Sequence, residues 1–315
     1  MKHIYGLSVE QNQKYRYAIK CGYFDSFEQD QRVWKHTFVG RFIWKYPNRV
    51  GVLKRWTDLL GHQPSWEDMT DDNLRDFVDE LKDSGLTPSS IKTMCAELKS
   101  VLNEGKSKVP SNEFMAILSI SGIMATKAVY LTPNEVVRFL CYNPKTKIER
   151  YVHHNFSVCM LTGARLVDAT RMTINNCDYE TNMLSYIPQK TPGVIVRVPV
   201  DERRNLRAIL SDIQERSCGL DVYNENVRKI CERLNITTMC TATKGGRDVT
   251  EPKYKLVSSH TARRTFATNL YLAGVSIEDI ALMMGHGTNT ETTKRYICAE
   301  RQLNRSVISY FQELQ

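Results

Sequence analysis

The sequence lacks any pair of cysteines in C-x-x-C spacing, although it holds nine cysteines among its 315 residues. An odd number of scattered cysteines fits neither a zinc site nor a disulfide framework, and it favours a reducing compartment. No stretch approaches the roughly 18 apolar residues of a membrane span, and the first residues contain no apolar core of a signal peptide. We therefore expect a cytoplasmic protein without a membrane partner.

Two signatures of phosphate chemistry are also missing. The chain has no G-x-x-x-x-G-K-[ST] loop, which disfavours ATP hydrolysis, and no carboxylates at metal-ligand spacing, which disfavours two-metal nuclease chemistry. His153 and His154 are adjacent but have no partner at metal spacing, and we interpret them as structural. We expect no metal and no cofactor.

Positive charge is in excess, with a formal net charge of +8. This excess fits a polyanionic partner such as nucleic acid, although many solvated surfaces look similar. Residues 1–50 hold nine basic against four acidic residues, which leaves open either an additional DNA contact or simply a first helix. Residues 67–83 hold eight acidic residues against two basic ones, so we expect this surface to avoid a phosphate backbone.

The apolar pattern predicts two domains. A first helix should carry Leu74, Phe77, Val78 and Leu81 on one face and end at Gly85, and a second helix should begin at the TPSS segment, residues 87–90. Residues 105–130 begin with Gly, Ser, Pro and Lys and show weak periodicity. We place the domain boundary near 125, which divides the chain into 1–125 and 126–315.

The second domain begins with a helix capped by Thr132, with Pro133 in its first turn and Glu135 three residues after the cap. Residues 182–200 form two apolar runs joined by the turn QKTPG, the one clear hairpin in the sequence. The surrounding pattern is helical. The expected fold is mainly α (α+β): a helical domain followed by a mostly helical domain with a small sheet.

Residues 258–266, SSHTARRTF, place His260 and Arg263 just before a run of helix-forming residues. A serine can cap such a helix, and the N-terminal backbone N–H groups already favour an anion. We expect a helix over about 261–273 with a negatively charged ligand at its start. Its buried stripe should consist of Phe266, Leu270 and Ala273.

A further helix should begin at Ser276, which pairs with Asp279 in capping-box spacing, and should end at Gly285. His286 follows directly, and a short polar helix leads to Tyr296. The pattern H-x-x-R, then G-H, then Tyr ten residues after that histidine resembles the C-terminal signature of the tyrosine recombinase (phage integrase) family.

The upstream half of the domain carries the same resemblance. LTGARLVDATRM, residues 161–172, is similar to the T-G-x-R box of the family, and the QKT of the hairpin turn is similar to its β-hairpin lysine. The resemblance covers about 126–300, with a weaker match before it. It implies these catalytic residues, with Asp168 in support: Arg165, Lys190, His260, Arg263, His286 and Tyr296.

The chemistry of a phosphodiester explains why such residues would gather. Planar guanidinium groups bind two phosphate oxygens at once and stay charged at cellular pH, so Arg165 and Arg263 would form a clamp. The phenol of Tyr296, with an ordinary pKa of about 10, needs nearby positive charge or a base to become a nucleophile.

The remaining residues would handle protons and geometry. Lys190, at a hairpin tip, would protonate the leaving 5′ oxygen. His260 and His286 would donate to the phosphate oxygens or hold the nucleophile, and His260 could accept the tyrosine proton. Asp168 would orient an arginine or Lys190.

The resemblance implies a site-specific recombinase that works through a 3′-phosphotyrosyl intermediate and a Holliday junction. Its partners would be double-stranded DNA with specific sites and an accessory DNA-bending protein. The protein would act as a homotetramer on synapsed DNA and would associate with the nucleoid. Residues 1–125 would be a core DNA-binding domain. The candidate contacts to the DNA backbone are Lys244, Arg247, Lys253, Lys255 and Arg264.

Two other functions remain open from the sequence. A type IB topoisomerase has a similar active site but reseals the same strand, and a DNA-binding regulator could keep the fold without the chemistry. The amphipathic residues after Tyr296 would dock either on a neighbouring protomer or on their own domain.

Overall fold

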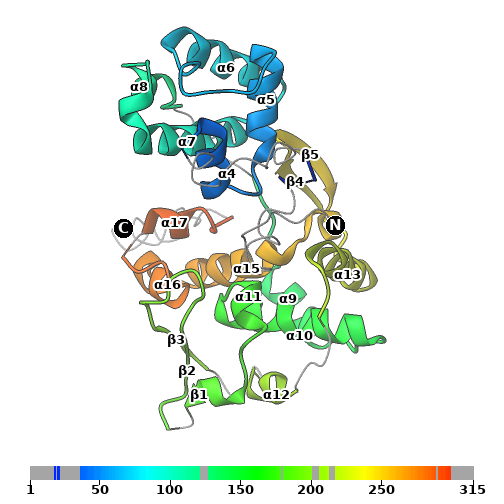
Figure 1. The fold of residues 1–315 in the computed structure, drawn as a ribbon. Coiled ribbons are helices and arrows are strands. Elements are labelled where there is room, and N and C mark those ends of the chain that lie inside the picture. The colour runs from blue at the N-terminus through cyan, green and yellow to red at the C-terminus, as the bar shows by residue number, and fades with distance from the viewer. Residues whose placement is uncertain are drawn as a thin grey trace, which may run out of the picture. The chain divides into compact units, whose positions relative to one another are not determined.

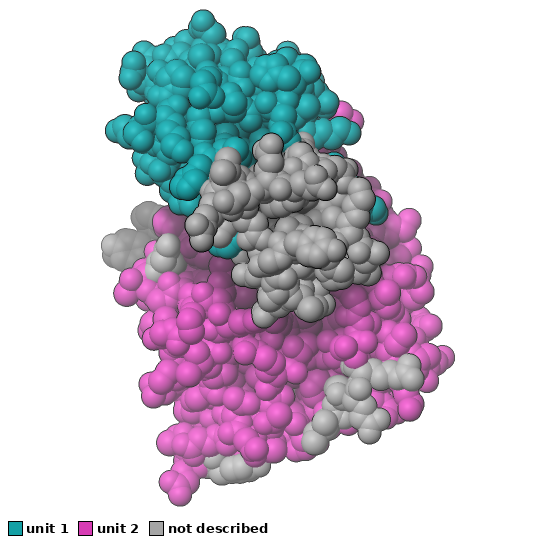
Figure 2. Space-filling view, in the orientation of Figure 1, with its two compact units in different colours: residues 1–125 teal, residues 126–315 magenta. Residues whose placement is uncertain are grey.

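The structure is a computed structural model that describes residues 18, 20–21, 36–120, 127–178, 180–200, 206–212, 217–288 and 290–298. The chain divides into two compact units, residues 1–125 and 126–315, which Figure 2 shows in teal and magenta. Each unit has a hydrophobic core of its own. Among the described residues, no helix is both long and apolar enough to cross a membrane.

The described part of the first unit is helical. Threonine hydroxyls cap three of its helices by accepting from backbone N–H groups, and the Trp56 and Phe77 rings stack in its core with centroids 4.3 Å apart. The elements are α4 (Phe38–Lys45), α5 (Val50–Leu60), α6 (Asp71–Asp83), α7 (Pro88–Glu104), η1 (Lys106–Lys108) and α8 (Phe114–Ile117).

Helix α6 follows its sequence pattern closely. Its four apolar residues Leu74, Phe77, Val78 and Leu81 are all buried, while its acidic residues lie on the other faces. Gly85 follows the helix with φ of +69°, the left-handed conformation that a helix-ending glycine adopts with little strain.

The second unit is built around α10 (Lys147–Thr162), which is buried along most of its length and packs against α15 (Ser259–Leu272) and α13 (Leu220–Arg233) (Figure 1). The other helical elements are α9 (Pro133–Leu140), α11 (Leu166–Ala169), η2 (Ile174–Asn176), α12 (Leu206–Ser211), α14 (Lys253–Leu256), α16 (Ile277–Met283) and α17 (Thr290–Lys294). The predicted capping box at Thr132 and Glu135 begins α9.

Two small antiparallel sheets complete this unit. One has the order β1 (Cys177–Asp178), β2 (Met183–Tyr186) and β3 (Val196–Pro199), and it contains the predicted hairpin. The other pairs β4 (Met239–Lys244) with β5 (Arg247–Pro252). The mainly helical fold with small antiparallel sheets is thus confirmed.

The prediction of a single clear hairpin is wrong because it overlooked β4 and β5. Gly245 and Gly246 join these strands with φ of +56° and +81°. Two-residue hairpin turns of type I′ require positive φ at both central residues, which favours glycine there. The sequence carried this signal, since β-branched residues flank the Gly-Gly pair on both sides.

Lys253 was predicted to contact the DNA backbone, and this prediction is also wrong. Its side chain is buried, with its ammonium 2.8 and 2.9 Å from the two carboxylate oxygens of Glu135, which is itself buried. The pair joins the start of α14 to the start of α9. A lysine held in this way offers no charge to a partner.

Replacing Lys253 with Met is expected to lower the free energy of unfolding by about 3–5 kcal/mol, because it leaves the buried Glu135 carboxylate without its cation. All four tryptophans lie within the first 66 residues, so unfolding of the second unit is best followed by circular dichroism in urea. The matched control is Lys255→Met on the same short helix, where the lysine is exposed. Equal stability of the two variants would contradict the prediction.

Candidate active site

The T-G-x-R box, residues 162–165, begins at the last residue of α10 and contacts α15 through a hydrogen bond. Gly163 ends α10 with φ of +69°, and a Cβ at this position would lie 2.5 Å from the Phe266 ring. The carbonyl oxygen of Gly163 accepts a hydrogen bond from Nη1 of Arg263. A glycine is therefore needed both for the backbone conformation and for the close approach that brings Arg263 to the box.

Arg165 follows two residues later, at the start of α11, and is half-buried. Among the described residues, its Nη1 has no hydrogen-bond partner although it is buried. A buried guanidinium N–H normally has an acceptor, so this atom is suited to an external one such as a phosphate oxygen.

Arg263 lies in the first half of α15 and is only 2% exposed. Its Nη2 donates to the Met284 carbonyl at 3.2 Å and lies 2.9 Å from Nε2 of His286. Burial lowers the pKa of Arg263, yet an arginine stays protonated at any cellular pH. The contacts hold a charged guanidinium in one orientation.

Tyr296 and His286 complete the cluster around this guanidinium. The Tyr296 ring lies 5.1 Å from the Arg263 guanidinium carbon and 5.4 Å from the His286 ring, measured to ring centroids. Tyr296 is half-buried, two residues beyond the end of α17. The structure therefore brings together three predicted site residues that are separated by up to 33 positions in the chain.

The pKa of His286 is lowered to about 4, first by burial and then by the charges of Arg263, Arg165 and Lys190. His286 is therefore neutral at pH 7. The contribution of Lys190 also indicates that the hairpin lysine lies near this cluster. Lys190 itself is exposed, in the turn between β2 and β3.

Asp168 fixes the backbone of this turn. It is 2% exposed, and its Oδ1 accepts from the backbone N–H of Gln189 at 2.8 Å and from Arg171 at 2.7 Å. Its charged partner is thus Arg171, which was not among the residues predicted from the sequence. Its link to Lys190 runs through the backbone of the preceding residue, Gln189.

His260 lies exposed in the first turn of α15. Partial burial of the ring lowers its pKa, and the charges of Arg264, Arg263 and Arg165 lower it further. These interactions place His260 in the same electrostatic environment as the clamp, and they keep it neutral at pH 7.

The other candidate DNA contacts are on the β4–β5 hairpin, α14 and α15. Lys244 pairs with Glu251 at 2.5 Å across the β4–β5 hairpin, and Arg247 is exposed next to the turn. Lys255 is exposed on α14, whereas Arg264 is half-buried on α15. The residues after Cys298, including most of the amphipathic tail, lie outside the described residues.

The interpretation of the histidine pair as structural agrees with its surroundings. The His153 ring stacks on Phe139 and its Nε2 lies 2.7 Å from the Phe139 carbonyl, while His154 is buried. No group of three His, Cys, Asp or Glu side chains within the described ranges could hold a metal ion.

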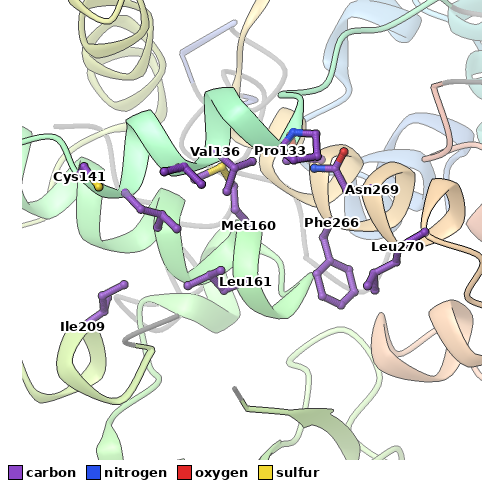
Figure 3. Close-up of a pocket in the computed structure, with 13 residues that line it drawn as sticks. Pro133, Val136, Cys141, Met160, Leu161, Ile209, Phe266, Asn269 and Leu270 are labelled. Carbon is purple, nitrogen blue, oxygen red and sulfur yellow. The ribbon is translucent and has the colours of Figure 1, made fainter. Parts of the chain in front are cut away.

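An apolar pocket of about 630 Å³ lies on the second unit between α9, the end of α10 and α15 (Figure 3). None of the predicted catalytic residues lines it. Ala273, predicted to be buried on α15, is exposed at the end of that helix beside the pocket. The polar cluster therefore occupies a different part of α15 from this cavity.

Comparison with known proteins identifies the family to which the chain belongs. Residues 129–302, more than half of the chain, match the phage integrase family. The fold is similar to the Tn1549 transposon integrase in complex with transposon right end DNA, at 15% identity and a TM-score of 0.60 over 88% of this chain and 98% of that one. A search of the curated proteins finds no significant match.

Two structures of lambda integrase are also similar. A dimer bound to a COC′ core site is 14% identical with a TM-score of 0.56, over 84% of this chain and 96% of that one. A tetramer bound to a Holliday junction has the same identity and TM-score, over 85% of this chain and 78% of that one. At such identities the likeness concerns the fold.

The second unit is mostly helical and packs Tyr296 against the guanidinium of Arg263 and the ring of His286. The chain belongs to the phage integrase family, whose members are tyrosine recombinases that break and rejoin DNA strands in site-specific recombination. The expectation of a tyrosine recombinase is confirmed. The roles of individual residues stay predictions.

Because the pKa of His286 is lowered in the folded chain, stability should depend on pH. Between pH 6.5 and about 4 the unfolded chain binds a proton that the folded chain does not. Stability is therefore complete above pH 6.5 and is lost as the pH falls toward 4, by at most about 3 kcal/mol from this residue, and by less because its ring is partly solvated.

Urea unfolding followed by circular dichroism at pH 7.5, 6 and 5 measures this loss. His260, His153 and His154 also have lowered pKa values and contribute in the same direction. A His286→Gln variant should show a shallower decline with falling pH than the wild type. An unchanged slope would refute the contribution of His286.

Proposed function

We propose that Tyr296 is the nucleophile of a site-specific DNA recombinase, with the buried guanidinium of Arg263 as its principal phosphate ligand. The single observation that carries this proposal is the packing of a half-buried tyrosine against an arginine whose orientation is fixed by two backbone carbonyls and His286. A fixed cation beside a phenol can hold a phosphate where the phenol oxygen can attack it.

In the proposed reaction the Tyr296 oxygen attacks the scissile phosphorus and the bond to the 5′ oxygen breaks. Arg165 and Arg263 bind the non-bridging oxygens, whose negative charge increases in the transition state. Lys190 donates a proton to the leaving 5′ oxygen. The products are a 3′-phosphotyrosyl link and a free 5′-hydroxyl, and attack by the 5′-hydroxyl of a partner strand reverses the step.

The proton of the Tyr296 phenol would pass to a neutral histidine. His260 has a lowered pKa, so it is unprotonated at pH 7 and able to accept a proton, whereas Nε2 of His286 is engaged by Arg263. His286 lies beside the tyrosine ring, and His260 lies close to the charges of the clamp. The bond energy is retained in the phosphotyrosine, so the reaction requires no nucleotide cofactor.

The partner in this proposal is double-stranded DNA with specific recombination sites, and the active assembly is a homotetramer on two synapsed duplexes. The tetramer of lambda integrase bound to a Holliday junction supports it by likeness of fold. Residues 1–125 would contact the DNA core site, and Arg264, Lys244, Arg247 and Lys255 would contact its backbone. An accessory DNA-bending protein and association with the nucleoid belong to the same proposal.

The test is covalent trapping of the wild-type chain on nicked suicide duplexes that carry candidate sites, in the presence of EDTA. A slow-migrating adduct on a denaturing gel is expected on one specific site, and peptide mapping should locate the linked nucleotide on Tyr296. Recombinant product from two such sites distinguishes recombination from strand relaxation. Tight binding to one site without any adduct would favour a non-catalytic regulator.

A further inference from the structure

Thr293 lies on α17, three residues before Tyr296, and its side chain is completely buried. Its Oγ1 is 3.0 Å from Nδ1 of His286, and its carbonyl oxygen accepts from the backbone N–H of Tyr296 at 2.9 Å. One residue therefore contacts both the histidine and the nucleophile of the proposed site.

Counting protons fixes the direction of the hydrogen bonds around His286. An arginine side chain can only donate, so Nε2 of His286, 2.9 Å from Nη2 of Arg263, must accept. A neutral imidazole carries one proton, which then resides on Nδ1 and points at the hydroxyl oxygen of Thr293.

The charges around the ring agree with this proton count. A protonated His286 would place a second cation against Arg263, and both groups would then donate toward each other. Burial and the neighbouring cations lower the pKa of His286 to about 4, which keeps the ring neutral at pH 7.

We infer that Thr293 is a positioning residue, which holds His286 in the Nδ1-protonated tautomer so that Nε2 orients the guanidinium of Arg263 beside Tyr296 before DNA binds. This inference rests on the proposed function for its consequence in catalysis. Without the hydroxyl, each tautomer leaves one ring N–H without an acceptor. The Nδ1–H would face a methyl group, and the Nε2–H would face the guanidinium of Arg263. Loss of the hydroxyl should therefore disturb the clamp without removing any residue that touches the phosphate.

The first measurement is the tautomer itself. The variants are Thr293→Val, which keeps the shape but removes the hydroxyl, and Thr293→Ser, which restores it. Nitrogen NMR of the DNA-free full chain with labelled histidine distinguishes protonated from unprotonated ring nitrogens, and a His286→Gln variant assigns the signals among the seven histidines. The wild type and Thr293→Ser should show Nδ1 protonated, and Thr293→Val should shift toward Nε2–H or a mixture.

The second measurement is the single-turnover rate of covalent adduct formation on the suicide duplex. Thr293→Val should slow this rate by about tenfold or more, as is typical when a partner that orients a functional histidine is lost. Thr293→Ser should recover most of the rate. The matched control is Thr265→Val: Thr265 is also buried, but within the described part of the chain its hydroxyl bonds only to the backbone of Thr261 and Leu131.

The control separates a positioning role from a merely structural one. Thr265→Val should lower thermal stability without changing the His286 signals. A wild-type tautomer or a wild-type rate in Thr293→Val would overturn the inference, as would equal losses of rate in the two valine variants with an unchanged tautomer. If the wild-type chain forms no adduct, the proposed function fails, and the NMR measurement still decides whether Thr293 sets the tautomer.

Discussion

Replacing Tyr296 with Phe should abolish the covalent adduct, with a loss of more than about 10⁴-fold in the single-turnover rate, because the variant has no nucleophilic oxygen. The phenylalanine ring can keep the packing against Arg263 and His286 that the tyrosine ring makes. Binding to the DNA site should therefore stay close to that of the wild type. A denaturing gel measures the first effect and a mobility-shift assay the second.

A second tyrosine in the same environment supplies the control. Tyr186 on β2 also interacts with the charges of Arg263 and Arg165, but it is only 8% exposed, and burial raises its pKa to about 12. A buried phenol that resists ionisation is a poor nucleophile, so Tyr186→Phe should retain adduct formation. Loss of the adduct in Tyr186→Phe with its persistence in Tyr296→Phe would reverse the assignment.

The site could be predicted from the sequence to the extent that its residues stand at fixed spacings within local motifs. Arg263, His286 and Tyr296 follow one another along consecutive helices, and the resemblance of their spacing to the phage integrase signature predicted a common location. The helix starts at Thr132 and Ser276 were predictable for the same reason, since a cap and its partner lie three residues apart.

Features that depend on contacts between distant segments were not predictable. Lys253 looked like one more basic surface residue, because its partner Glu135 lies 118 positions earlier in the chain. Thr293 is one of several threonines in a polar segment, and only the packing of α17 against the end of α16 brings it to His286. Spacing predicts which residues share an element, whereas burial and partners follow from how the elements pack.

The same distinction explains why the sequence could not show how Arg263 is held. Its guanidinium is held by the carbonyl of Gly163 at the end of α10 and, just after α16, by the carbonyl of Met284 and Nε2 of His286, so the acceptors come from two distant segments. Three fixed acceptors orient one planar fork, so that its remaining N–H groups can face a phosphate. Among the described residues, Nε of Arg263 is buried without a hydrogen-bond partner, which leaves it suited to such a ligand.

Replacing Arg263 with Lys should accordingly reduce the single-turnover rate of adduct formation by about 10³-fold, the scale on which a fixed donor to a developing oxyanion contributes. The lysine keeps the positive charge, so the fall in rate measures the contribution of the planar, oriented guanidinium and not that of electrostatic attraction to DNA. Affinity for the DNA site should fall much less than the rate. The rate of adduct formation is measured on suicide duplexes at saturating protein, so that weaker DNA binding does not contribute to it.

The matched control is Arg138→Lys on α9, where an exposed arginine also donates to a backbone carbonyl, that of Leu234 at 2.8 Å. This variant should cleave at the wild-type rate, because its carbonyl contact lies outside the cluster around Tyr296. If Arg263→Lys also cleaved at that rate, a point charge would suffice at this position, and the orientation of the guanidinium by Gly163, Met284 and His286 would have no part in catalysis.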